Sequence, residues 1–112
     1  MAREVIKEFE NFTFERVTGV GSNDTPYEQL NVRSKGLAEK HVVEVRLDYR
    51  GNYEYNGEPV KYSYSGVEVT HGMRMKKDTL AETQEYIKVL QEALDVAFEV
   101  QKYCILNGWW NG

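Results

Sequence analysis

The chain has 112 residues, the size of one domain, so we treat residues 1–112 as a single unit. Hydrophobic residues make up 41% of it and aromatic residues 12%, which is enough to bury a core and excludes a wholly disordered chain. The net charge of −4 argues against a general binder of polyanions, although residues 33–77 carry a local net charge of +3 between two acidic ends.

The first third of the chain contains one clear strand pattern and then many turn-forming residues. Phe12, Phe14 and Val17 are separated by polar residues, which indicates a half-buried strand between residues 9 and 17. Glycine, asparagine, aspartate and proline then dominate residues 19–26. We therefore predict a loop over residues 19–40 with one short strand near residues 30–33.

The strongest sheet pattern lies in the middle of the chain. Apolar residues alternate with charged ones at Val43, Val45, Leu47 and Tyr49. Asn56-Gly57 suits a tight hairpin turn, because both central residues of that turn need a positive φ. We predict one long hairpin centred there, with irregularities near Gly51 and Gly66, so that residues 1–77 are mainly β.

The last third changes to a helical period. Asp78 or Thr79 can cap a first turn, and neither glycine nor proline occurs between Lys77 and Asn107. We therefore predict one long helix over residues 78–106 and a tail over 107–112. The predicted fold class is α+β: an antiparallel sheet of four to five strands followed by this helix. The paired tryptophans of the tail are expected to pack against the sheet or a partner subunit.

The predicted helix has two adjoining apolar stripes. One consists of Leu80, Ile87, Leu90, Leu94, Ala97 and Cys104, and the other of Tyr86, Val89, Ala93, Val96, Val100 and Tyr103. A helix on one sheet needs only about 100° of apolar surface, so we expect the second stripe to form a homodimer interface. The alternative is that Val5, Ile6 and Phe9 fold back over that stripe within one chain.

Residues that could carry catalysis are few. His41 and His71 are 30 residues apart, and a single cysteine, Cys104, cannot complete a zinc site. We expect neither a metal nor a cofactor, and no enzyme activity. The charged start of the chain and the lack of a long apolar run further predict a soluble, cytoplasmic protein without a membrane partner.

Basic and aromatic residues interleave within the predicted hairpin. Aromatic rings beside lysine and arginine bind single-stranded nucleic acid by stacking and charge. The expected phosphate contacts are Arg46, Arg50, Lys61, Arg74 and Lys76. The expected stacking residues are Tyr53, Tyr55 and Tyr62. The alternative is that these tyrosines are only good strand formers.

The order of these elements resembles a known family. A strand over residues 43–49, a hairpin, and then Gly72-Met73-Arg74-Met75 running into a long helix are similar to the positive-cofactor-four type of transcriptional coactivator and its bacterial and phage relatives. The resemblance covers roughly residues 41–95. It implies a dimerising helix and a curved sheet that binds single-stranded DNA, with Arg46 at the position of the family's strand arginine.

Two functional hypotheses follow. The first is a non-catalytic homodimer that binds single-stranded DNA or RNA through the basic and aromatic sheet surface. The second is a small accessory protein of a phage or mobile element, which binds a host protein or holds a small nucleotide between its subunits.

Overall fold

The computed structural model describes residues 2–21, 24, 26–50, 54–55, 58–59, 63–72 and 77–109. The elements in chain order are β1 (Ala2–Glu8), β2 (Phe12–Val20), β3 (Pro26–Ser34), α1 (Leu37–Lys40), β4 (Val43–Arg50), β5 (Glu54–Tyr55), β6 (Glu58–Pro59), β7 (Ser63–His71) and α2 (Leu80–Leu106). The predicted α+β class with antiparallel strands and a long C-terminal helix is confirmed. Among the described residues, no helix combines the length and apolarity of a membrane span.

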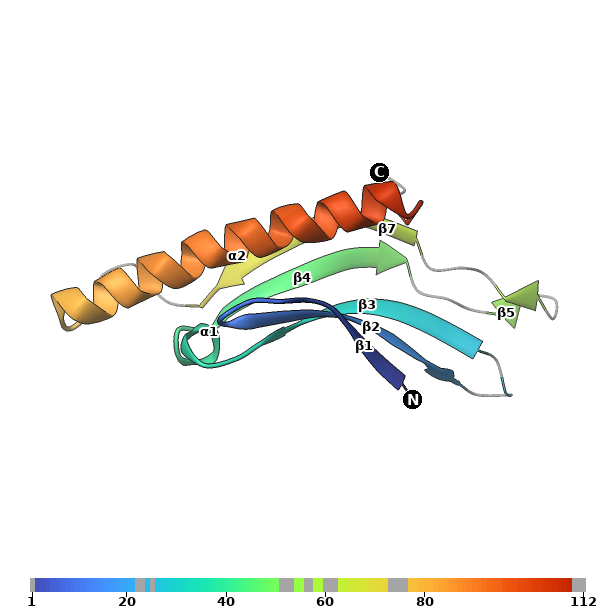
Figure 1. Cartoon of the computed structure of the whole chain (residues 1–112), viewed down its shortest axis with the longest axis horizontal. Coiled ribbons are helices and arrows are strands. Elements are labelled where there is room, and N and C mark those ends of the chain that lie inside the picture. Colours follow the sequence, from blue (N-terminus) through green and yellow to red (C-terminus); the bar gives the residue numbers. More distant parts are fainter. Residues whose placement is uncertain are drawn as a thin grey trace.

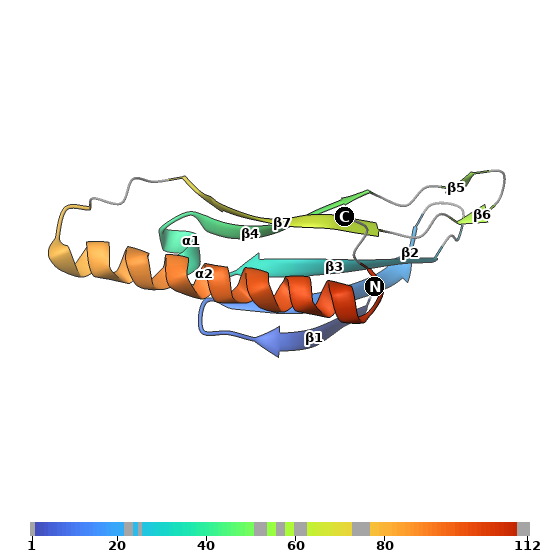
Figure 2. The same ribbon diagram turned by 90° about the horizontal axis from the view of Figure 1, so that it is seen from above.

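The strands form two main sheets where one was expected. The first sheet has the order β1-β2-β3, the second consists of β4 and β7, and the short strands β5 and β6 form a separate pair. Both main sheets lie on the same side of α2, which runs along them for most of the length of the molecule (Figures 1 and 2). α2 contacts β2 in the first sheet and both β4 and β7 in the second.

The predicted loop over residues 19–40 was wrong, although the short strand expected near residues 30–33 lies within β3. β2 continues to Val20, and β3 pairs with it in an unbroken antiparallel register from Phe12↔Ser34 to Val20↔Pro26. Of these turn-forming residues, Gly19 lies within β2 and Pro26 begins β3, so the connection between the two strands is confined to residues 21–25. The alternation on β3 was hidden because polar side chains surround its buried Leu30.

The long hairpin is confirmed. β4 pairs with β7 from Val43↔His71 onward, and β5 pairs with β6 through Tyr55↔Glu58, on either side of the predicted turn. The register shifts between Asp48, which is opposite Gly66, and Tyr49, which is opposite Tyr64. This is a β-bulge at the predicted position near Gly66. Residues 56 and 57 and Gly51 lie outside the described residues.

Both ends of α2 are defined by local hydrogen bonds. The Thr79 side chain accepts a hydrogen bond of 3.1 Å from the Glu82 N–H, so Thr79 is the N-cap. At the other end Gly108 has a φ of 71°, and the Trp109 N–H donates to the Cys104 carbonyl at 2.8 Å. This is a Schellman motif, which needs the left-handed conformation that glycine adopts without strain.

The core lies between α2 and the two sheets. Its largest sheet residues are Phe12, Phe14, Leu30, Val43, Val45 and Tyr64. The helix contributes Tyr86, Val89, Ala93, Val96, Val100 and Cys104, all with no exposed surface. A face this apolar packs against a sheet as readily as against a helix, because the hydrophobic effect depends on the apolar area removed from water and not on the type of element that covers it.

This packing corrects the predicted dimer interface. Tyr86, Val89, Ala93, Val96 and Val100 are fully covered within one chain, so no partner can reach them, and Tyr103 packs at the edge of the same core. The alternative, cover by the N-terminal segment within one chain, holds in part. From that segment Ile6 and Phe9 only border the core, while Val5 is exposed.

Trp109 packs against the second sheet. Its side chain is buried, its ring centroid lies 5.3 Å from that of Tyr64, and its carbonyl accepts the Tyr64 N–H at 2.8 Å. The expectation that this tryptophan packs against the sheet is therefore confirmed. Trp110 lies outside the described residues.

Candidate functional site

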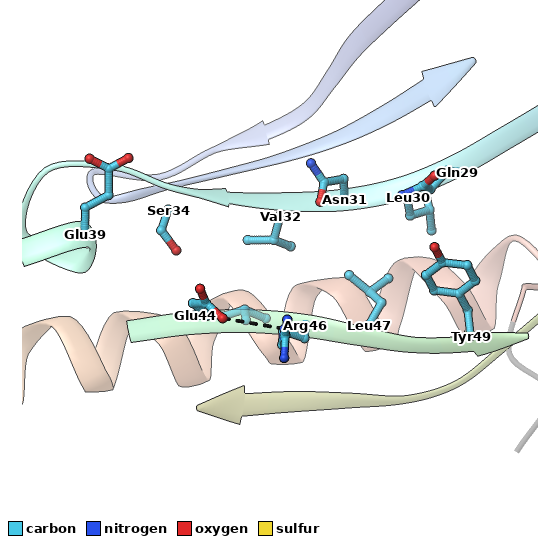
Figure 3. A pocket seen from close by; sticks show the side chains of 11 residues that line it. Gln29, Leu30, Asn31, Val32, Ser34, Glu39, Glu44, Arg46, Leu47 and Tyr49 are labelled. Atoms are coloured by element: carbon cyan, nitrogen blue, oxygen red, sulfur yellow. Dashed lines mark ion pairs between the residues drawn. The ribbon is translucent and has the colours of Figure 1, made fainter. Parts of the chain in front are cut away.

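The two main sheets meet along β3 and β4 without joining. These strands run in opposite directions on either side of a gap, with α2 behind it (Figure 3). The described residues show no backbone hydrogen bond between β3 and β4. Two side-chain bonds connect the sheets instead: Ser34 Oγ donates to the Val43 carbonyl at 2.9 Å, and the Leu30 N–H donates to Tyr64 Oη at 2.5 Å.

Between β3 and β4 lies an open cleft of about 430 Å³. It is lined by residues 29–32 and 34 of β3, Glu39 of α1, and residues 44–47 and 49 of β4. Val32 and Leu47 project between the two strands, and the Tyr49 ring reaches from β4 toward the Leu30 end of β3 (Figure 3). The lining therefore combines an apolar centre with polar residues at the rim.

Backbone groups of both strands point into this cleft. The Leu30 N–H is bonded to Tyr64, so it points away from β2, and the backbone groups of Val32 point the same way because successive residues alternate. On β4 the Val43 carbonyl points toward Ser34, so those of Val45 and Leu47 face the cleft too. The cleft thus has a strand edge on each side, only partly capped by Tyr64 and Ser34.

The rim of the cleft carries opposite charges with an acidic excess. Arg46 and Glu44 project from β4, with 3.5 Å between Arg46 Nε and Glu44 Oε2, and Glu39 adds a second carboxylate from α1. Both members of the pair are more than half exposed, so water screens their interaction. Two carboxylates against one guanidinium favour a basic ligand over a phosphate backbone.

Of the predicted nucleic-acid contacts, the structure places Arg46 at this cleft. Arg50 ends β4 and Tyr55 belongs to β5, but their side chains lie outside the described part of the chain. The remaining predicted contacts also lie outside the described residues: Tyr53, Lys61, Tyr62, Arg74 and Lys76. The predicted basic and aromatic surface therefore stays a prediction.

A second charged cluster covers the face of the first sheet that points away from α2. The Glu15 carboxylate is fully buried, and it accepts hydrogen bonds from Arg3, from Arg33 Nε at 3.2 Å and from Asn31 Nδ2 at 3.2 Å. Both arginines are thus committed to neutralising a buried carboxylate. They hold the three strands together and are poor candidates for binding phosphate.

The two histidines flank Tyr86. Tyr86 Oη lies 2.6 Å from His71 Nδ1, and the rings of His41 and Tyr86 are 5.3 Å apart. Burial raises the pKa of the Tyr86 hydroxyl. The Lys40 ammonium lowers the pKa of Glu85, with a smaller effect from His41. Because Tyr86 is fully buried, its hydroxyl connects α2 to His71 of the second sheet instead of facing solvent.

Cys104 is equally inaccessible. It has no exposed surface, and burial raises the pKa of its thiol to about 11. A thiol that stays protonated and covered is a poor nucleophile. Among the described residues, no group of three or more histidine, cysteine, aspartate or glutamate side chains could hold a metal ion.

Sequence reasoning missed most of the cleft. Ser34 and Glu39 lie in the segment that was predicted to be a loop, whereas Val32 belongs to the short strand predicted near residues 30–33. The available signal was the alternation of Leu30 and Val32 with polar neighbours, which predicts a longer strand. That signal does not reveal which strand edges remain unpaired. Comparison with protein-family models, curated proteins and solved structures finds no match to this chain.

Proposed function

We propose that this protein is a non-catalytic binding protein that takes up an extended, basic segment of a partner protein in the cleft between β3 and β4. The observation that carries the proposal is the pair of strand edges that face each other there without pairing. Exposed strand edges bind extended peptides through backbone hydrogen bonds, and neighbouring pockets select alternate side chains.

The length and lining of the cleft suit such a segment. The β3 side spans residues 29–34, which corresponds to about 17 Å of extended chain and about five ligand residues. Val32 and Leu47 provide apolar contacts for one face of the segment. Glu39 and Glu44 provide charge for lysine or arginine side chains on its other face, while Arg46 opposes an acidic ligand.

Single-stranded nucleic acid is the competing ligand. In the described part of the chain, Arg46 is the one predicted phosphate contact at the cleft, and its Nε lies 3.5 Å from the Glu44 carboxylate. The net charge of −4 further disfavours a polyanionic ligand. We therefore rank it second and make it an arm of the test.

The experiment selects peptides from a random library on the immobilised full chain and then measures binding of labelled hits by fluorescence anisotropy. A labelled single-stranded oligonucleotide is measured in parallel at low and high salt. We expect hits that combine basic and β-branched residues, and backbone amide shifts on binding at Val32 and Leu47 by NMR.

Charge reversal at the rim provides the matched comparison. Glu44→Lys should weaken binding of a basic peptide at least tenfold. Glu4→Lys, the same change at an exposed position of β1, on the edge of the first sheet that is farthest from the cleft, should leave it unchanged. Peptide binding without shifts in β3 and β4 would overturn the proposal. So would oligonucleotide binding that weakens steeply with salt while no peptide is selected.

A further inference from the structure

The side of α2 that faces away from the sheets is apolar but uncovered. Leu80, Ile87, Leu94, Phe98 and Ile105 are between 39% and 74% exposed, whereas the opposite side of the helix is fully buried. Figures 1 and 2 show this outer side open along the whole of α2. Large apolar side chains gathered along one line mark an interaction surface.

These residues follow a regular spacing once the intervening glutamines are included. Gln84, Gln91 and Gln101 are also exposed and fall in the gaps. The eight positions form the outer seam, with alternating steps of four and three residues: Leu80, Gln84, Ile87, Gln91, Leu94, Phe98, Gln101 and Ile105. An average step of about 3.5 residues is the pattern by which one helix packs along another helix.

The outer seam complements itself when two copies run antiparallel. With the twofold axis between residues 92 and 93, the facing pairs are Leu80 with Ile105, Gln84 with Gln101, Ile87 with Phe98 and Gln91 with Leu94. Three of these four pairs match apolar with apolar or amide with amide. Each pair occurs twice, as an isologous interface requires.

Charges beside the outer seam favour the same orientation. Lys88 follows Ile87 and Asp95 follows Leu94, so both lie on one flank of the outer seam, and both are exposed. In the antiparallel pair Lys88 of each copy lies within two residues of the level of Asp95 in the other, giving two ion pairs. In a parallel pair in register, each residue lies level with the same residue of the other copy. Lys88 would then be about 10 Å along the axis from Asp95 of the other copy.

We infer that two copies of this chain associate through the outer seam of α2 as an antiparallel twofold pair. The seam is about 39 Å long, and each copy contributes five large apolar side chains to it. The glutamine layers lower stability but select the register, as polar core positions do in coiled coils. Because α2 lies behind the cleft, pairing leaves both clefts open (Figure 3).

Sedimentation and charge reversal test the association. The wild-type chain should sediment as a dimer at micromolar concentration. Lys88→Asp should raise the dissociation constant about tenfold by replacing two attractions with two repulsions, and Lys88→Asp combined with Asp95→Lys should restore it. Lys102→Asp is the matched control, because Lys102 lies on the same flank but within two residues of the level of the uncharged Ala81 in the antiparallel partner.

A control measurement and a further variant complete this test. Lys88 Nζ also lies 3.8 Å from Glu10 within the chain, so the melting temperature of each variant should be measured alongside. Leu94→Arg places a charge at the centre of the outer seam without touching the core, so it should give a folded monomer.

Disulfide trapping tests the orientation. Gln84→Cys and Gln101→Cys chains, mixed and oxidised, should form a mixed disulfide, while neither variant should cross-link to itself. The native Cys104 is buried and will not compete. A monomeric wild type at 100 µM, a dimer indifferent to Leu94→Arg, or efficient self-cross-linking of Gln84→Cys would overturn the inference.

Discussion

Replacing Tyr64 with phenylalanine removes the hydroxyl that connects the two sheets. Tyr64 Oη accepts the N–H of Leu30 across the gap between β7 and β3, and both residues are at most 1% exposed. Phenylalanine keeps the ring and therefore its packing against Trp109. The substitution thus leaves the shape of the core unchanged and removes the hydrogen-bond acceptor of the buried Leu30 N–H.

The expected loss follows from that buried donor. A buried N–H left without an acceptor costs about 1–3 kcal/mol, which exceeds the net value of an ordinary hydrogen bond because water does not replace the lost partner. For a chain of 112 residues, the unfolding entropy converts this loss to a fall in melting temperature of about 4–13 °C.

Urea unfolding followed by circular dichroism measures this loss, because the dependence on urea also shows whether the surface exposed on unfolding has changed. Tyr27→Phe is the matched control: it makes the same chemical change on β3, at a partly exposed side chain. If the free energies of unfolding of Tyr64→Phe and Tyr27→Phe fall by amounts that agree within about 0.5 kcal/mol, then water or a backbone shift provides a new acceptor for the Leu30 N–H. The reasoning then fails.

Three further predictions concern a buried thiol, the end of α2 and an ion pair at the surface. At pH 8 the Cys104 thiol, with a pKa of about 11 against an ordinary 9.0, should react with a thiol reagent about a hundredfold more slowly than in urea-unfolded chain. Gly108→Ala should lower the free energy of unfolding by about 1–2 kcal/mol, measured by urea denaturation, because alanine is strained at a φ of 71°. The Lys35 ammonium lowers the pKa of Glu8 below 4.5, so this carboxylate stabilises the native state above that pH, and the contribution is lost as the pH falls through the lowered value. Lys35→Ala should therefore flatten the acid limb of a stability profile measured between pH 3 and 6.

Local patterns predicted the elements that depend on neighbours in sequence. The alternation from Val43 to Tyr49, the turn signal at residues 56 and 57, and the cap at Thr79 all reflect interactions within a few residues. The β-bulge near Gly66 belongs to the same class. Where such signals were diluted, as in β3, the predicted strand was too short, because polar residues on a strand look like loop residues.

The orientation of α2 could not be predicted from its own sequence. Both apolar stripes have the composition of a buried face, and nothing local distinguishes a sheet partner from a helix partner. The structure buries the stripe that contains Val89 and Val96, and it leaves Leu80 and Leu94 exposed. Packing decided this, because the two sheets together cover only one side of the helix.

The sequence alone determined the α+β class, the single long helix and the central hairpin, because periodicity and turn chemistry act over a few residues. Tertiary structure alone decided that β3 and β4 lie side by side without pairing, and that Tyr64 and Ser34 span the gap. Apart from proline, every residue carries the same backbone groups, so no side-chain pattern reveals which strand edges will stay open. The candidate cleft consists of just such edges.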